Sequence, residues 1–165
     1  MGLHPQVLTL LERMAAANLK PVVDLTPVEA RVQFDAVAAP PDREPTPVGA
    51  TEEIAVPGPA GAMAVRLYRP DGAGGDALPM LVYFHGGGHV IGSLDSHDEV
   101  ARVLCAGAGC LVASVDYRLA PENKFPAAVE DAFAATQWLA ANAASIGADA
   151  GVVAVGGDSA GANIA

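Results

Sequence analysis

The sequence Val152-Val153-Ala154-Val155-Gly156-Gly157-Asp158-Ser159-Ala160-Gly161 carries the clearest signal for the architecture of this chain. Its four leading residues form an apolar run typical of a short buried strand, and residues 162–165 are typical of a first helical turn. Between them, residues 157–161 fit the pattern G-x-S-x-G, in which a serine occupies a very tight turn from strand to helix. Such a turn strains the serine backbone, and the flanking glycines leave room for a close approach. We therefore predict that Ser159 stands clear of a sheet beside a backbone N–H, as a candidate nucleophile.

Strands and helices alternate in the segment before this turn. Apolar runs at 80–84 and 110–115 predict two further buried strands, with a helix over 98–108 between them. A long helix is predicted to begin near Pro126 and to end at Gly147. Its inner face is expected to carry Val129, Ala132, Phe133, Thr136 and Leu139, with Glu130 and Asp131 away from that face. This alternation predicts an α/β fold built on a mostly parallel sheet.

The first forty residues lie outside this alternation. A helix is predicted over 3–18, ended by Pro21, and its apolar face consists of Leu3, Val7, Leu10, Leu11 and Met14. A second helix is predicted from Pro27, capped by Thr26 with Glu29 in its first turn, and Val28, Val32 and Ala36 follow at helical spacing. The two helices are either an ordinary extension or a cap over a pocket, and the pattern does not decide between these.

A linker and a hairpin connect the helices to the alternating segment. Residues 40–49 are rich in proline and charge, which predicts an extended linker. Strand-like runs at 52–56 and 63–68, joined by turn residues at 57–61, predict an antiparallel hairpin. We therefore divide the chain into a helical cap segment with its linker, residues 1–45, and the N-terminal part of an α/β core, residues 46–165.

The composition limits the class of protein. The chain has 165 residues, a formal net charge of −10 and only two lysines, which makes it a poor partner for nucleic acid or an anionic membrane. It has no basic segment before an apolar core at its start and no apolar run of membrane-spanning length, so we expect a cytoplasmic location. Cys105 and Cys110 lack the spacing of a zinc site, and we expect buried free thiols, with a disulfide as the alternative.

Three polar segments follow the predicted parallel strands and therefore converge on one edge of the sheet. They are His85-Gly86-Gly87-Gly88-His89, the stretch from Asp116 to Glu122, and the turn at Ser159. A glycine run lets backbone N–H groups approach a substrate, and such donors stabilise the negative oxygen of an acyl-transfer intermediate. A glycine turn without a ligand and a phosphate loop are the alternatives, but the glycine spacing matches neither the dinucleotide fingerprint nor the P-loop. Together with the later G-x-S-x-G, the run predicts an oxyanion-binding loop.

These three motifs resemble those of the hormone-sensitive lipase-like group (bacterial family IV) of α/β-hydrolase carboxylesterases. The resemblance spans essentially the whole chain and rests on His85–Gly88 with Val90–Ser93, on Asp116–Glu122 with Phe125–Ala128, and on Gly157–Asn163. It implies an α/β-hydrolase fold with a mostly parallel central sheet, antiparallel first strands and an N-terminal helical cap. It also implies that the core of that fold is truncated here after the serine turn.

The resemblance further implies the chemistry of the site. Ser159 would attack small acyl esters of short to medium chain length and form an acyl-enzyme, and the N–H groups of Gly87, Gly88 and Ala160 would hold the oxyanion. No metal and no organic cofactor is implied. A small-molecule ester is the implied partner, and a homodimer is left open.

A general base for the serine is the part that the sequence lacks. A serine nucleophile needs a histidine and an orienting carboxylate, which in this fold follow the serine in the chain. All four histidines precede Ser159: His4, His85, His89 and His97. We expect His85, with Gly86, to support the glycine loop and His89 to line the pocket, where the family usually has a bulky aromatic. A metal cluster of the last three histidines is a further alternative.

We therefore expect the catalytic Asp and His beyond residue 165, in the remainder of the enzyme, present as another chain or segment. On its own, residues 1–165 would be inactive and would leave the strand before Ser159 as an unpaired apolar edge. A catalytically incompetent fragment, or a small-molecule-binding module of the same fold, is the alternative function.

Overall fold

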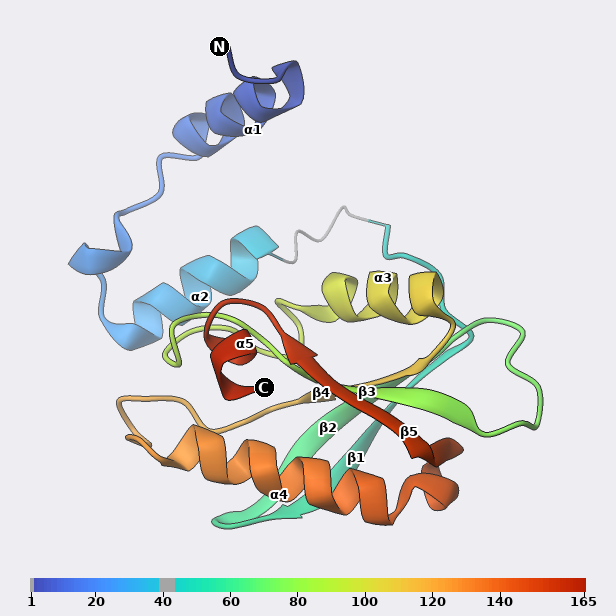
Figure 1. The fold of residues 1–165 in the computed structure, drawn as a ribbon. Coiled ribbons are helices and arrows are strands. Elements are labelled where there is room, and N and C mark those ends of the chain that lie inside the picture. Colours follow the sequence, from blue (N-terminus) through green and yellow to red (C-terminus); the bar gives the residue numbers. More distant parts are fainter. Residues whose placement is uncertain (1, 39–43) are drawn as a thin grey trace.

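The computed structural model describes residues 2–38 and 44–165, and its centre is a twisted sheet (Figure 1). The strands are β1 (Ala50–Gly58), β2 (Gly61–Arg69), β3 (Leu78–Phe84), β4 (Leu111–Val115) and β5 (Ala148–Gly157), in the order β1-β2-β4-β3-β5. β3 pairs in parallel with both β4 and β5, whereas β2 is antiparallel to β1 and to β4. Of these strands only β2 runs against the others, which confirms the mostly parallel sheet with antiparallel first strands.

The β1–β2 hairpin is confirmed, but its turn is tighter than predicted. The paired register continues to Gly58 opposite Gly61, so that only Pro59 and Ala60 connect the strands. The sequence analysis assigned Pro57 to the turn, as part of the run of turn residues at 57–61. β1 is an edge strand of the described sheet, where a proline is tolerated.

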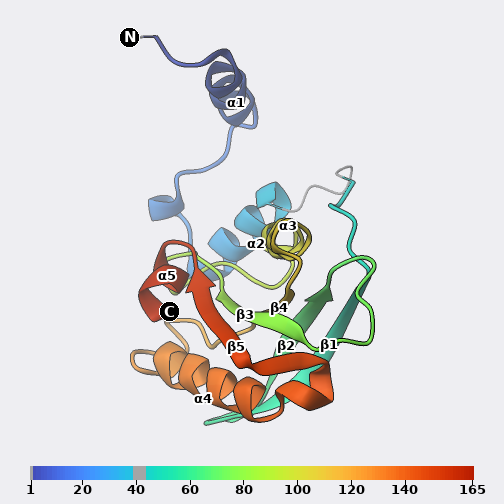
Figure 2. The same ribbon diagram turned by 45° about the vertical axis from the view of Figure 1, so that its right-hand side comes forward.

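Helices cover both faces of the sheet. They are α1 (Pro5–Ala16), α2 (Pro27–Ala38), α3 (Asp98–Ala108), α4 (Ala127–Ala141) and α5 (Ala160–Ile164), with single 3₁₀ turns at Val22–Asp24 and Ala143–Ile146. α2 and α3 lie on one side of the sheet and α4 lies on the other, while α1 stands away from the body (Figures 1 and 2). In the described part of the chain no helix is long and apolar enough to cross a membrane.

The core has two unequal parts, one on each side of the sheet. The smaller part packs against α3, and the larger packs against α4. The α3 side includes Tyr68, Tyr83, Ala101, Cys105, Cys110 and Val112, and the two cysteines are buried free thiols. The α4 side includes Val65, Leu67, Met80, Val82, Phe84, Leu111, Val115 and Leu139.

The N-terminal helices form where the sequence predicted them, but their apolar faces are not buried as expected. The Thr26 N–H donates to Glu29 Oε2 over 2.9 Å and the Glu29 N–H donates to Thr26 Oγ1 over 3.3 Å, which confirms the cap of α2. Val28 and Val32 are nevertheless 63% and 66% exposed, because α2 turns other residues towards the sheet. Val7, Leu11 and Met14 of α1, and Leu3 just before it, are also exposed. The prolines at 40 and 41 of the predicted linker lie outside the described residues.

Two predictions about α4 are wrong. The helix ends at Ala141, and a separate 3₁₀ turn leads to Gly147, which adopts φ +70°. Its inner face is only partly as predicted: Ala132 and Leu139 are buried, but Phe133 is 65% exposed while Asp131, expected away from that face, is only 2% exposed. Hydrogen bonds to Arg118 explain why Asp131 is buried. Asp131 Oδ2 accepts from the backbone N–H of Arg118 over 2.9 Å and from its Nε over 2.8 Å. That partner turns the helix so that small residues, rather than Val129 and Phe133, face the sheet.

Replacing Asp131 with asparagine is expected to lower the free energy of unfolding by about 2 kcal/mol, because it removes the charge of a buried carboxylate and leaves its hydrogen bonds with Arg118 incomplete. Urea denaturation of the chain measures the effect. Glu130→Gln is the control, since Glu130 is an exposed neighbour at 3.8 Å from Arg118. Equal stability of the two variants would show that Asp131 does not hold the helix.

The strand β5 also differs from its prediction as a strand buried on both faces. Val152 and Val155 are 51% and 45% exposed, because β5 is the last strand in the described sheet and α4 covers only part of it. The carboxyl ends of β3, β4 and β5 nevertheless point the same way, which brings the three predicted polar segments to one edge of the sheet.

Candidate active site

Ser159 lies at a strained turn between β5 and α5. Its backbone adopts φ +49° and ψ −115°, a region that non-glycine residues rarely enter. A Cβ atom on either Gly157 or Gly161 would overlap the carbonyl oxygen of Phe84 at the end of β3. The glycines on both sides of the serine are therefore required by the close approach of β3, as the sequence predicted.

The glycine loop after β3 folds back on itself. Gly87 has φ +121°, and its carbonyl oxygen accepts from the N–H groups of Val90 and Ile91, each over 3.0 Å. A Cβ on Gly87 would overlap the Ile91 carbonyl, whereas the space around Gly88 is open. The loop thus keeps a fixed shape while leaving bare backbone beside Ser159.

Ser159 and the glycine loop share one cavity of about 490 Å³. Its lining consists of Val22, Leu25, Pro27, Ala30, Gly87, Gly88, Val90, Ile91 and Ser159. Ala160, the third expected oxyanion donor, follows Ser159 as the first residue of α5 and is buried. The structure therefore brings the predicted nucleophile together with Gly87 and Gly88, and residues of the N-terminal segment line the same cavity.

Asp158, to which the sequence analysis assigned no role, connects the serine turn to the glycine loop. Its Oδ1 accepts from the Tyr83 hydroxyl over 2.6 Å and from the Gly86 N–H over 2.9 Å, and it lies 3.6 Å from His97 Nε2. Burial, followed by the hydrogen bond to Asp158, raises the pKa of Tyr83, so that this hydroxyl stays a donor. No sequence pattern could have identified this contact, since 72 positions separate Gly86 from Asp158.

His85 is buried beneath the glycine loop. Its Nδ1 lies 2.7 Å from the Gly86 carbonyl oxygen, and its ring stacks on Tyr117 with centroids 4.4 Å apart. The Tyr117 hydroxyl in turn donates to the His85 carbonyl over 2.6 Å. Burial lowers the pKa of His85, with a smaller opposing effect from the Gly86 carbonyl, so the neutral ring is favoured. His85 thus contacts the loop that it was expected to support.

The other histidines have contacts elsewhere in the described structure. His97 precedes α3 with its Nδ1 at 3.0 Å from Ser96 Oγ, and His4 precedes α1. His89, expected to line the pocket, is not among the residues that line the Ser159 cavity, and its carbonyl accepts from Ala120 N–H over 2.8 Å. In the part of the chain that the structure describes, no histidine ring is hydrogen-bonded to Ser159, and no three His, Cys, Asp or Glu residues could hold a metal ion.

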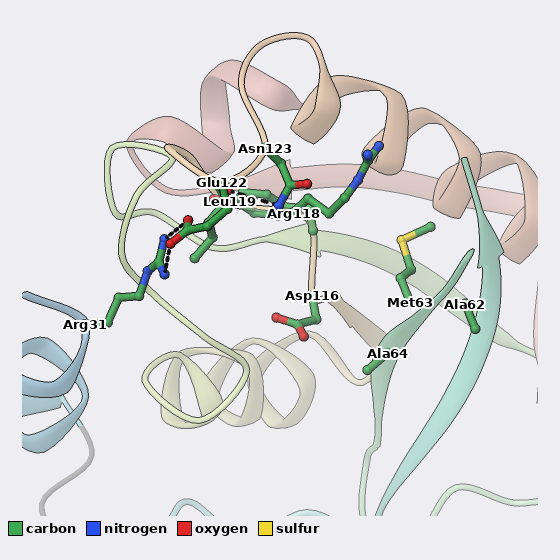
Figure 3. Close-up of a pocket in the computed structure, with 10 residues that line it drawn as sticks. Arg31, Ala62, Met63, Ala64, Asp116, Arg118, Leu119, Glu122 and Asn123 are labelled. Carbon is green, nitrogen blue, oxygen red and sulfur yellow. Dashed lines mark hydrogen bonds and ion pairs between the residues drawn. The ribbon is translucent and has the colours of Figure 1, made fainter. Parts of the chain in front are cut away.

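A second cavity, of about 680 Å³, lies beside the segment that follows β4 (Figure 3). It is lined by Arg31, Ala62, Met63, Ala64, Asp116, Tyr117, Arg118, Leu119, Glu122 and Asn123. The Arg31 guanidinium pairs with the Glu122 carboxylate at its edge (Figure 3). The second sequence motif therefore contributes a contact with α2 rather than a group beside Ser159.

Comparison with known proteins identifies relatives of this chain. Residues 81–165, more than half of the chain, match a family model described as the alpha/beta hydrolase fold. The esterase LipI of Mycobacterium tuberculosis is 52% identical over 114 residues, which are 68% of this chain and 36% of LipI.

Two solved esterases match almost the whole chain. The hyperthermophilic esterase of Pyrobaculum calidifontis is 43% identical with a TM-score of 0.89, over 100% of this chain and 52% of that esterase. The ester hydrolase EH1AB1 from the Lake Arreo metagenome is 40% identical with a TM-score of 0.92, over 99% of this chain and 53% of its own. The chain therefore spans about half the length of these solved esterases and about a third of LipI. It belongs to the α/β-hydrolase family, and its relatives named here are esterases, as the resemblance to the hormone-sensitive lipase-like group predicted.

Proposed function

We propose that this chain supplies the nucleophile and the oxyanion hole of a serine carboxylesterase that acts on acyl esters of short to medium chain length. One observation carries the proposal: Ser159, on its strained turn, opens into the same cavity as the bare backbone of Gly87 and Gly88. The three relatives described above are named as esterases or an ester hydrolase, which supports the reaction class.

In the proposed reaction the Ser159 hydroxyl attacks the ester carbonyl while a general base takes its proton. The negative oxygen of the tetrahedral intermediate accepts hydrogen bonds from the N–H groups of Gly87, Gly88 and Ala160. Loss of the alcohol, protonated by the same base, leaves an acyl-enzyme on Ser159. Water then attacks the acyl group, releases the acid and restores the serine. None of these reaction steps requires a metal or an organic cofactor.

The general base and its carboxylate partner are proposed to come from polypeptide outside these 165 residues. Two observations support this. In the described residues no histidine is bonded to Ser159, and the solved esterases are about twice as long as the segment that matches. The exposed apolar edge beside β5, which includes Val129, Phe133, Val152 and Val155, offers a surface for that polypeptide. If two copies of the chain paired through this edge, analytical ultracentrifugation would detect the dimer by its mass.

The N-terminal segment is proposed to be the cap of the substrate pocket. Val22, Leu25, Pro27 and Ala30, all within the proposed cap segment 1–45, line the Ser159 cavity, which favours a cap over an ordinary helical extension. The proposed location is the cytoplasm, and this proposal rests on the sequence composition described above.

A chimera tests the proposed function. This chain is joined to the part of the Pyrobaculum calidifontis esterase that it does not match, and hydrolysis of p-nitrophenyl acetate is measured for the chimera and for the 165-residue chain alone. The chimera is expected to hydrolyse the ester, and the chain alone is expected to be inactive. A folded chimera without activity would contradict the esterase proposal and favour the binding-module alternative.

Replacing Asp158 with alanine is expected to lower kcat of the chimera by about tenfold or more, because the Gly86 N–H loses its acceptor and the oxyanion donors are displaced. Asp158→Asn keeps an oxygen at the same position and should retain most of the activity. Steady-state kinetics on p-nitrophenyl acetate give both values. If the alanine variant matched the unmodified chimera, Asp158 would have no part in holding the glycine loop.

A further inference from the structure

We propose that Arg31 is a positioning residue that fixes both α2 and the glycine loop around the Ser159 cavity, and that it thereby determines which esters fit. The statement about esters rests on the proposed function, whereas the contact itself does not. Arg31 lies on α2, far in sequence from the segments that it joins, and it was not among the residues that the motifs identified.

The Arg31 guanidinium uses all of its nitrogens on two other segments. Its Nε donates to the Val90 carbonyl over 2.7 Å, directly after the glycine loop. Its Nη2 donates to the Ala120 carbonyl over 2.9 Å and to Glu122 Oε2 over 2.7 Å, and its Nη1 donates to Glu122 Oε1 over 3.0 Å. This two-pronged pairing with a carboxylate suits the planar fork of arginine and not the single ammonium group of lysine.

α2 has little apolar contact to hold it in place otherwise. Ala30 is the only buried residue that α2 contributes in the described structure, and its valines face solvent. Two further contacts with the body come from the same face as Arg31. Asp35 Oδ1 accepts from Ser93 Oγ over 3.0 Å, and the Phe34 ring lies 5.9 Å from the ring of His97. Polar bonds, with Arg31 making four of them, therefore set the position of this helix.

Through its bond to Val90, Arg31 joins α2 to the segment after the glycine loop, and both of these line the Ser159 cavity. Pro27 and Ala30 of α2 are among the lining residues, as are Gly87, Val90 and Ile91. Because the Val90 carbonyl is bound directly, loss of the guanidinium would release the end of the glycine loop and the helix together. Ser159 itself, held by β5 and α5, would stay in place. The expected consequence is a change in the width of the cavity rather than in the nucleophile.

The pair also lines the second cavity. Arg31 and Glu122 lie at the border of the second cavity, with the guanidinium coming from α2 and the carboxylate from the loop after β4 (Figure 3). The Glu122 side chain is 51% exposed, whereas that of Arg31 is 26% exposed. Glu122 therefore supports the guanidinium from the solvent side, while the two backbone carbonyls hold it from the protein side.

Hydrogen exchange of the chain itself tests the contact without any need for activity. In Arg31→Met, the amides of Val90 and Ile91, both bonded to the Gly87 carbonyl, are expected to lose about tenfold or more in protection. Arg66→Met is the matched control, because Arg66 also pairs with several carboxylates but none beside this cavity. It should lower overall stability and leave the protection of Val90 and Ile91, relative to that of β3, unchanged. Unchanged protection in a folded Arg31→Met chain would overturn the proposal.

The chimera tests the effect on selectivity. The ratio of kcat/KM for p-nitrophenyl hexanoate to that for the acetate is expected to change by about fivefold or more in Arg31→Met and in Arg31→Lys, with most of the change in KM. Glu122→Gln, which keeps one oxygen and both backbone carbonyls as acceptors, should change it less. An unchanged ratio, or an equal change in Arg66→Met, would contradict the role in selectivity. If the unmodified chimera hydrolyses neither ester, the proposed function fails, and the exchange measurement alone decides whether Arg31 fixes the loop.

Discussion

Replacing Ser159 with alanine is expected to lower kcat of the chimera by about 10⁴-fold or more, because the acyl-enzyme can no longer form. The oxyanion donors and the cavity would be intact, so substrate binding should change little. Ester hydrolysis by the purified chimera gives the measurement. Ser145→Ala is the control, since Ser145 bonds only the Asn142 carbonyl in the exposed turn after α4.

A glycine at the same position separates catalysis from backbone strain. Ser159→Gly should be as inactive as the alanine variant, yet its free energy of unfolding should rise by about 1 kcal/mol, because glycine adopts φ +49° and ψ −115° without strain. The alanine variant keeps the strain and should gain nothing. If serine, alanine and glycine at this position gave equal stability, the turn would not be strained. Substantial activity in the alanine variant would exclude Ser159 as the nucleophile.

Replacing Gly161 with alanine is expected to cost about 3 kcal/mol or more of folding free energy, or to prevent folding altogether. The added Cβ would overlap the Phe84 carbonyl and lie 2.6 Å from the His85 carbonyl, both backbone atoms at the end of β3. Neither can move without disturbing the strand between β4 and β5. Urea denaturation of the chain gives the stability, and circular dichroism shows whether it folds.

Gly107→Ala is the control for that substitution. Gly107 lies in the last turn of α3 with nothing within 4 Å of its added Cβ, so alanine should be neutral or stabilise the helix by up to about 1 kcal/mol. A Gly161→Ala chain as stable as the Gly107→Ala chain would contradict the close packing of the serine turn on β3.

The elements of the core were predictable because their signals are local. The apolar run of β3 and the helix over Asp98–Ala108 are found where periodicity placed them. The inner face of α4 was not predictable, because it depends on Arg118, a partner thirteen positions away whose bond to Asp131 outweighs the burial of Val129 and Phe133. The same holds for α2, where Arg31 faces the body and the valines do not.

The candidate site likewise contains residues that the sequence predicted and residues that it did not. Ser159, Gly87 and Gly88 were predicted from two short motifs, because each motif needs its glycines for steric reasons that the sequence displays. The residues that connect the motifs were missed. Asp158 reaches Gly86 across 72 positions, and Arg31 reaches Val90 across 59. Such contacts depend on how the strands and α2 assemble, and no local pattern encodes them.

Labelling with a fluorophosphonate probe, followed by mass spectrometry of the digested protein, examines the proposed nucleophile itself. The account predicts one modification, on Ser159, in the chimera, and no modification of the 165-residue chain alone or of the Ser159→Ala chimera. Labelling of the chain alone at the rate of the chimera would place the base within these residues. A folded chimera that is unlabelled, or labelled at another residue, would contradict the assignment of Ser159 as an activated nucleophile.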